Sequence, residues 1–209
     1  YVLDTTGMSQ LRDLNSDGDA LDTSENVLLT FSNPAGDIKL PGDSSGHQFN
    51  FGMVWKDGYL WASLSSALGG GLSTRGHLIK LDPVALTMSV MHSGLRTPNG
   101  LGIGVDNELF GSDNQGNWLP ANKLNHYPRT GPGKWFGFHN AHALGNGDTG
   151  PIEPPTLWLP HGEIDLSPSQ PLAFDSRTHF ADQMVLCELT GGGANRVFLE
   201  KVNGVYQGA

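Results

Sequence analysis

Acidic and amide side chains alternate near the N-terminus, in the segment DLNSDGDALDTSE over residues 13–25. Gly18 permits a sharp turn in the middle of this segment. Oxygen ligands at alternate positions of a tight loop are typical of a Ca²⁺ site, although an EF-hand would place a bidentate Glu at offset 11, where Ser24 stands, one residue before Glu25. We therefore predict a short calcium loop with a structural role, and the alternative is a solvated acidic turn. The predicted ligands, at offsets 0, 2, 4, 6 and 9, are Asp13, Asn15, Asp17, Asp19 and Asp22.

A second set of polar residues stands at the two ends of a predicted hairpin, SGLRTPNGLGIGVDNELFGSDNQGNWLP, residues 93–120. Arg96 and Asn99 precede its first strand, and DNQGNW at 113–118 follows its second strand. Antiparallel neighbours bring these two ends to the same edge of a sheet. His47 precedes another predicted strand. An imidazole, a guanidinium and several amides at strand ends would form a polar pocket.

The elements that must position these residues have the two-residue period of β-strands, with turn residues between them. No stretch longer than one turn keeps the apolar spacing of a helix. We predict an all-β chain of about ten strands, at 26–31, 49–55, 58–65, 76–83, 86–91, 100–105, 107–113, 122–128, 183–190 and 195–208.

The turns between these strands repeat. WKDGYLWASL begins at Trp55 and GVDNELFGSD begins at Gly104, 49 residues later. A third copy, FADQMVLCEL at 180–189, comes 76 residues after the second, and the segment 129–165 accounts for the extra length. A period of about 40–50 residues built from short strands is typical of propeller blades, whereas two sandwiches would give a less regular spacing. We expect the segment 129–165 to be a functional or lid-like loop.

Composition limits the classes of partner. The chain has 209 residues, a net charge of −9 and only 12 Lys and Arg, which disfavours a nucleic-acid partner. No apolar run approaches the roughly 18 residues of a membrane-spanning helix. Cys187 is the only cysteine, and its apolar neighbours in MVLCEL predict that it is buried. We expect residues 1–209 to be a single, partial domain cut from a longer protein, since neither end has a start Met or a tail.

Three motifs resemble the six-bladed β-propellers of the soluble quinoprotein glucose dehydrogenase and sorbosone dehydrogenase superfamily. They are His47-Gln48 before one strand, Arg96-Thr97-Pro98-Asn99-Gly100 before the next, and Gln115-Gly116-Asn117 after its partner. The segments WLPHGEIDLSPSQP and LTGGGANRVFLEKVNGVYQGA are similar to one branch, the large propellers of planctomycete-like bacteria that are often fused to c-type haem domains. The resemblance implies an all-β, six-bladed propeller, of which this chain supplies three to four blades.

The resemblance also implies a dehydrogenase that uses pyrroloquinoline quinone (PQQ) and Ca²⁺ to oxidise a sugar or polyol, in the periplasm or outside the cell. His47 would be the general base, and Arg96 would bind the quinone oxygen. A c-type haem domain or a cytochrome would accept the electrons. The implied cofactor contacts are Gln48, Thr97, Asn99 and Gln115, and the implied Ca²⁺ ligands are the carbonyls of Gly116 and Asn117. Thr97 replaces the usual Asn of the turn, Asn99 replaces Gln, and SSALGGG at 65–71 replaces an Asp-rich segment.

Two other functions fit the sequence. One is a non-catalytic propeller that binds carbohydrate or protein and is fused to electron-transfer modules. The other is a calcium-dependent hydrolase or lactonase, in which the Arg96 turn has no evident role. Single residues also have structural interpretations: Arg96 suits a tie between blades, and His47 a loop position. The remaining candidates are His139 with His142 as a metal pair, His161 with Glu163 as a cavity lining, and Trp118, Trp135 and Phe136 as sugar-stacking or core aromatics.

Overall fold

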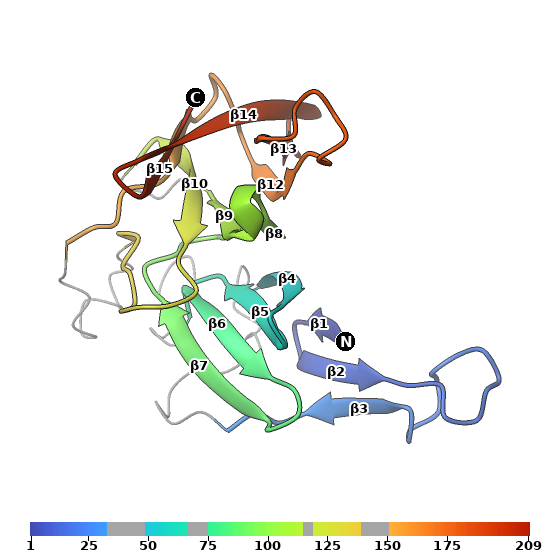
Figure 1. Ribbon diagram of the computed structural model, residues 1–209. Helices are drawn as coiled ribbons and strands as arrows, with labels where there is room; N and C mark the ends of the chain where they lie inside the picture. Colours follow the sequence, from blue (N-terminus) through green and yellow to red (C-terminus); the bar gives the residue numbers. More distant parts are fainter. Residues whose placement is uncertain (33–48, 67–74, 115–118, 139–150) are drawn as a thin grey trace.

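The computed structural model describes residues 1–32, 49–66, 75–114, 119–138 and 151–209 (Figure 1). This part of the chain consists of strands joined by turns, with one 3₁₀ turn, η1 (Val105–Asn107). No helix in the described ranges is long and apolar enough to span a bilayer. The strands are β1 (Val2–Asp4), β2 (Gly7–Leu11), β3 (Asn26–Leu29), β4 (Asn50–Lys56), β5 (Tyr59–Leu64), β6 (His77–Asp82), β7 (Thr87–His92), β8 (Leu101–Ile103), β9 (Leu109–Asp113), β10 (Ala121–Tyr127), β11 (Leu157–Pro160), β12 (Pro168–Ala173), β13 (Gln183–Glu188), β14 (Gly193–Val202) and β15 (Val205–Gly208).

The strands form four antiparallel sheets that follow one another along the chain: β1–β3, β4–β7, β8–β11 and β12–β15. Within each sheet, strands that are neighbours in sequence are also paired in space. Two hairpins depend on tight turns in which both central residues have positive φ, at Asp57-Gly58 and Asn203-Gly204. This is the type I′ geometry that Asp-Gly and Asn-Gly pairs favour, and its twist matches that of the flanking strands.

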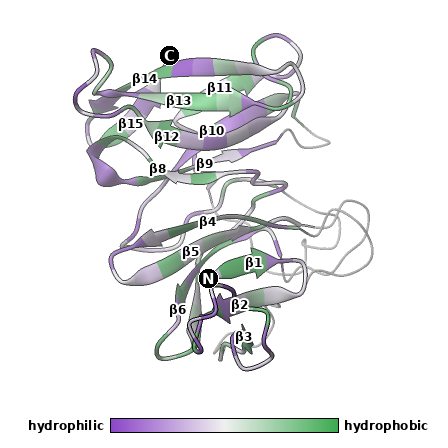
Figure 2. Ribbon diagram, turned by 90° about the vertical axis from the view of Figure 1, so that its right-hand side faces the viewer, coloured by the Kyte–Doolittle hydropathy of each residue, from purple (hydrophilic) through white to green (hydrophobic). Residues whose placement is uncertain are grey.

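Consecutive sheets meet through their first strands: β1 contacts β4, β4 contacts β8, and β8 contacts β12. At these contacts the backbones of neighbouring first strands lie close together, with no side chain between them at the glycines. A Cβ added to Gly52 of β4 would lie 2.5 Å from the amide nitrogen of Leu101, and one added to Gly102 of β8 would overlap the carbonyl of Pro171. Figure 2 shows the sheets in succession from β1–β3 to β12–β15. Sheets that follow one another in this way, with their first strands in contact, are the blades of a β-propeller.

An apolar layer fills the space between each pair of neighbouring blades. Met8 packs with Leu60 and Ile79 between the first and second blades. Trp61 and Leu101 belong to the layer between the second and third. The third layer joins the third and fourth blades, and its buried members include Phe110, Leu124, Met184 and Val197. Burial of each such side chain contributes about 1.5–3 kcal/mol, so these layers hold the blades together.

The predicted fold class, an all-β propeller of which this chain supplies three to four blades, is confirmed by the four sheets. The three repeated turns occupy the same place, between the first and second strands of the second, third and fourth blades. The prediction of one strand at 195–208 was wrong, because Asn203-Gly204 divides it into β14 and β15. Four strands were missed: β1 and β2, β11 inside the predicted loop 129–165, and β12 with its two prolines.

The prediction that Cys187 is buried was also wrong. Met184 and Leu186 face the core, so the two-residue period of β13 puts Cys187 on the exposed face. The aromatic residues Trp135 and Phe136 are buried, and Phe136 packs with Trp61 and Tyr127 between blades. Trp135 and Phe136 are therefore buried core residues, as the structural interpretation of these aromatics predicted.

Candidate functional site

One edge of the propeller collects the polar residues of the 93–120 segment. We call it the Arg96 edge: it is the edge at which β4, β8 and β12 begin and at which β5, β9 and β13 end. Pairing of Leu101 with Gly111 brings the residues before β8 next to the residues at the end of β9. The Asn114 N–H donates to the carbonyl of Thr97 at 3.2 Å. The predicted meeting of these two strand ends is thus observed.

The carboxylate of Asp113, the last residue of β9, shapes the turn that contains Arg96. It accepts the backbone N–H of Thr97 at 2.8 Å and that of Arg96 at 3.2 Å. Asp113 is 0% exposed, and the ammonium of Lys123 lies 3.8 Å from it while donating to the Phe136 carbonyl at 2.9 Å. Burial raises the pKa of Asp113, and Lys123 and the two N–H groups oppose that rise. The buried ion pair fixes the backbone of the turn.

The second blade holds the other side of the same turn. The backbone N–H and the hydroxyl of Ser66 donate to the Arg96 carbonyl at 2.9 and 3.1 Å. The hydroxyl of Ser63 donates to the Pro98 carbonyl at 3.0 Å. Both backbone groups of Arg96 are therefore used by the fold, and its main chain ties the third blade to the second.

Three buried polar atoms at this edge have no hydrogen-bond partner among the described residues: Arg96 Nε, Thr97 Oγ1 and Asn114 Oδ1. Asn99 lies half-buried in the same turn. Burial lowers the pKa of Arg96, and attraction to Asp113 partly offsets this. Since folded proteins satisfy most of their buried polar atoms, three atoms without a partner among the described residues make this edge the candidate site for a polar ligand. A guanidinium in such a place can bind a carboxylate or a carbonyl oxygen.

The same capping arrangement recurs in the neighbouring blades. In the second blade the Ser65 hydroxyl accepts the Phe49 N–H at 2.7 Å, and in the fourth Glu188 accepts the Ser167 N–H at 3.1 Å. Ser65, Asp113 and Glu188 each lie where the second strand of a blade ends. A polar side chain at the end of the second strand thus fixes the backbone before the first strand, blade after blade.

The fourth blade adds a pair of carboxylates to this edge. Asp165 is buried, accepts a hydrogen bond from Asn195 at 3.2 Å through Oδ2, and has no described partner at Oδ1. Its burial and the charge of Glu188 raise the pKa of Asp165 to about 6. Asn114 reaches this blade by donating to the Ser167 hydroxyl at 3.3 Å. The edge therefore carries positive and negative groups on adjacent blades.

The structure brings together Arg96, Thr97 and Asn99 of the predicted cofactor site. Asp113 and Lys123 were missed as site residues. Asp113 ends the largely apolar strand β9, which was an available signal, whereas Lys123 lies inside β10 and gave none. His161 and Glu163 are exposed in the turn after β11. The predicted site residues that lie outside the described ranges are His47, Gln48, Gln115, Gly116 and Asn117, and the same holds for Trp118, His139 and His142.

The acidic segment 13–25 forms the far end of the β2–β3 hairpin, apart from the Arg96 edge (Figure 1). Its predicted ligands gather in one loop, where Asn15 donates to Asp17 at 2.8 Å and to Asp22 at 3.2 Å. The structure adds Glu25, whose carboxylate faces this loop and which the EF-hand spacing had set aside. This loop therefore has the residue types of a cation site.

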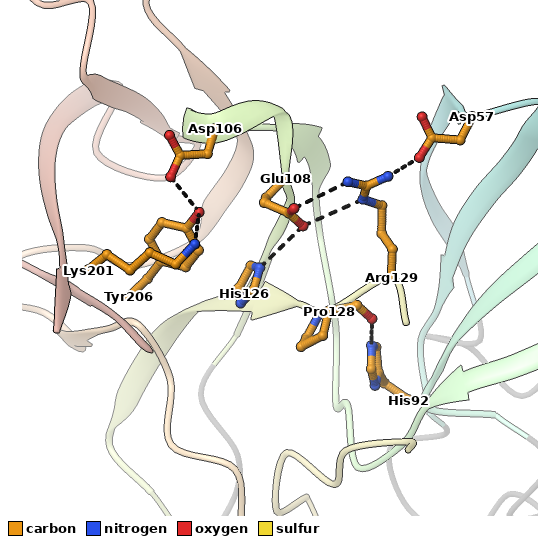
Figure 3. A network of polar contacts seen from close by, with 9 residues as sticks. All are labelled: Asp57, His92, Asp106, Glu108, His126, Pro128, Arg129, Lys201 and Tyr206. Carbon is orange, nitrogen blue, oxygen red and sulfur yellow. Dashed lines mark hydrogen bonds and ion pairs between the residues drawn. The ribbon is translucent and has the colours of Figure 1, made fainter. Parts of the chain in front are cut away.

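The opposite edge carries a network of charges that joins three blades (Figure 3). Arg129 follows β10 and pairs with Asp57 of the second blade and, at 3.2 Å, with Glu108 of the third. Tyr206 of the fourth blade donates to Asp106 of the third at 2.8 Å. The Arg129–Asp57 and Tyr206–Asp106 contacts link different blades, so this network holds neighbouring blades together at the opposite edge.

Neither a protein-family model nor a curated protein matches the sequence. Solved structures do match in shape. One is a putative oxidoreductase (glucose dehydrogenase) from Thermus thermophilus, with a TM-score of 0.54, 20% identity, and coverage of 73% of this chain and 48% of that one. Another is the PQQ-bound form of an aldose sugar dehydrogenase from Streptomyces coelicolor, with a TM-score of 0.54, 18% identity, and coverage of 77% and 49%.

The chain has the β-propeller fold of these dehydrogenases. A third protein of the same shape, described as a glucose dehydrogenase, gives a TM-score of 0.55 at 16% identity, with 76% of this chain and 51% of the other covered. The chain thus spans about half the length of each of these propellers. The fold resemblance predicted from the His47, Arg96 and Gln115 motifs agrees with these matches.

Proposed function

We propose that the protein is a PQQ-dependent dehydrogenase that oxidises a sugar or polyol. The observation that carries the proposal is the Arg96 turn, which is clamped by its backbone while its buried guanidinium nitrogen Nε has no described partner. The PQQ bound to one protein of the same fold gives the class of ligand. The chain spans about half of that protein, so the activity, the substrate and the electron acceptor of the whole molecule are all part of the proposal.

The residues of the Arg96 edge fit a quinone with several carboxylates. Arg96 would supply a charge-assisted hydrogen bond to a quinone oxygen, and Thr97 and Asn114 have unsatisfied side-chain oxygens beside it. The Asp113 carboxylate lies behind the turn and is already bound to two backbone N–H groups, so it does not compete for Arg96 as a direct partner. Asn99, Gln48 and Gln115 would complete the polar lining.

In this mechanism the bound PQQ supplies the hydride acceptor. His47 would take the proton from the sugar hydroxyl, because a neutral imidazole is a suitable general base at neutral pH. Arg96 would hold negative charge that develops on the acceptor side. The carbonyls of Gly116 and Asn117 would hold a Ca²⁺ ion at the same site. The roles of His47, Gly116 and Asn117 rest on the sequence motifs, since these three residues lie outside the described ranges.

We further propose a periplasmic or extracellular location and a c-type haem domain or cytochrome as the electron acceptor. Both rest on the resemblance of the sequence to haem-fused propellers. Neither is needed for the assignment of the Arg96 edge.

The test is to load the full-length protein with PQQ and Ca²⁺ and to measure PQQ binding and dye reduction with a panel of sugars. Arg96→Met should weaken PQQ binding by about 10- to 100-fold, because a hydrogen bond from a charged group contributes about 1.5–3 kcal/mol. His47→Ala should keep PQQ binding and lower kcat by about 10²- to 10⁴-fold. Arg177→Met is the matched control, since Arg177 is exposed and pairs with Asp175.

The outcomes separate the candidate functions. Absence of PQQ binding by the wild-type protein would contradict the proposal. Sugar binding without PQQ binding or dye reduction would favour the alternative of a non-catalytic carbohydrate-binding propeller.

A further inference from the structure

The acidic loop at the end of the β2–β3 hairpin contains a buried carboxylate that is only half satisfied. Glu25 is 1% exposed. Its Oε1 accepts the backbone N–H of Leu14 at 2.7 Å and that of Asn15 at 3.2 Å. Its Oε2 is buried and has no hydrogen-bond partner among the described residues. A buried carboxylate oxygen without a hydrogen bond is unfavourable, because it has lost its contact with water and gained nothing in return. A positive partner such as a cation would remove this cost.

Glu25 faces other carboxylates and not a basic residue. One oxygen each of Glu25, Asp17 and Asp19 lie within 4.8 Å of one another. Two oxygens bound to one Ca²⁺ ion at 2.3–2.6 Å can be at most about 5 Å apart. The three oxygens are therefore close enough to share a single Ca²⁺ ion. No salt bridge of the described residues involves any of the three.

The loop backbone is already folded around this group. Asp13 accepts the N–H of Ser16 at 2.6 Å and that of Gly18 at 3.1 Å. Gly18 has a φ of 94°, which a glycine adopts without strain. Asn15 joins Asp17 to Asp22 through its amide. Further oxygen ligands are thus within the same turn, as a cation with six to eight ligands requires.

We propose that this loop binds one Ca²⁺ ion and that Glu25, with Asp17 and Asp19, supplies its central ligands. The cluster contains only oxygen donors in an irregular arrangement, which Ca²⁺ accepts, whereas Mg²⁺ requires a strict octahedral geometry at short distances. The ion ties the start of the loop to Glu25 at its end, and so closes the β2–β3 hairpin of the first blade. This site is independent of the Ca²⁺ ion proposed with PQQ.

The experiment is a calcium titration of the chelator-treated full-length protein without PQQ, by calorimetry and by thermal melting. Wild type should bind one more Ca²⁺ per chain than Glu25→Gln, which keeps Oε1 and its two hydrogen bonds. Asp19→Asn changes an exposed ligand and should show the same loss, so the test does not depend on a buried variant. Glu200→Gln, an exposed change on β14, is the control and should bind as wild type does.

The melting temperatures distinguish two roles of Glu25: a Ca²⁺ ligand, or a residue that only stabilises the folded loop. With chelator, Glu25→Gln should melt at or above wild type, because the unsatisfied charge is gone. With Ca²⁺, the wild type should rise by several degrees relative to its chelated form and Glu25→Gln should not. An equal lowering of Glu25→Gln in both conditions, an unchanged stoichiometry in both variants, or binding of Mg²⁺ in preference to Ca²⁺ would overturn the proposal. Retained calcium binding in a protein that fails to bind PQQ would reject only the proposed function.

Discussion

At the scale of single residues, His92 is a buried imidazole whose protonation state is fixed by its neighbours. It ends β7, is 2% exposed, and stacks on Tyr127. Its Nδ1 accepts the Lys134 N–H at 3.0 Å, so the other nitrogen, Nε2, carries the proton and donates to the Pro128 carbonyl at 2.9 Å. Burial is the main reason that the pKa of His92 falls to about 4.

This lowered pKa predicts a loss of stability in mild acid. The unfolded imidazole takes up a proton near pH 6.5 and the folded one only near pH 4, so the free energy of unfolding falls as the pH drops between these values. The full effect is roughly 3 kcal/mol. Urea unfolding of wild type and His92→Asn from pH 7.5 to 4 should show a shallower slope for the variant. The control His161→Asn changes an exposed turn histidine, and a slope equal to that of His92→Asn would contradict the argument.

At the scale of elements, the blades depend on glycines where the first strands cross. Gly102 of β8 faces the carbonyl of Pro171 in β12, and Gly100 faces the N–H of Gln170, which a Cβ would approach to 2.5 Å. In both cases the added Cβ would collide with backbone atoms, which cannot change rotamer as a flexible side chain can. These glycines set the distance between the third and fourth blades.

Gly102→Ala should therefore destabilise the protein by about 1–3 kcal/mol or more, as overpacking of a tight contact does. Gly193→Ala is the matched control, because a Cβ there meets nothing within 4 Å and the residue also lies in a strand. Chemical unfolding of the two variants measures the difference. Equal stabilities for Gly102→Ala and wild type would show that the strands can separate without cost.

At the scale of the whole molecule, the edge opposite Arg96 is held by long-range ion pairs. Arg129 joins Asp57 of the second blade to Glu108 of the third (Figure 3). The side chains are partly exposed, with 25% for Arg129 and Glu108 and 52% for Asp57. Solvent therefore screens each pair. A guanidinium shared by two carboxylates nevertheless has a fixed geometry, and in such a network ion pairs contribute measurably to stability.

Arg129→Met should lower the free energy of unfolding by about 1 kcal/mol, and the difference from wild type should shrink in high salt. Arg177→Met removes a pair between neighbouring residues on one exposed loop, where the arginine is 87% exposed, and should change stability little. Melting curves at low and high salt test both. A salt-independent loss in Arg129→Met would point to packing of its aliphatic stem instead of its charge.

The sequence by itself determined the propeller class and most of the strands. Alternation of apolar residues, Asp-Gly and Asn-Gly turns, and a repeat of 49 residues are local patterns, and they located ten segments and the propeller class. Strands with weak local signals were missed, such as β12. Its Pro168 and Pro171 argue against a strand in general and are tolerated here because β12 lies at the edge of its sheet. The meeting of Arg96 with the end of β9 could also be predicted, because strand pairing follows from the short turn between them.

Tertiary structure decided which charges are buried, paired or left unsatisfied. Asp113 and Lys123 lie ten positions apart on different strands, and their spacing does not predict that they pair. Glu25 lies one residue beyond the EF-hand position, and its spacing does not predict that it faces Asp17 and Asp19. The free energy of a charge depends on the water that folding removes and on partners brought from other strands. Those quantities exist only after the blades have packed, which is why the sequence located the two candidate sites but not the burial of Glu25 or the pairing of Asp113 with Lys123.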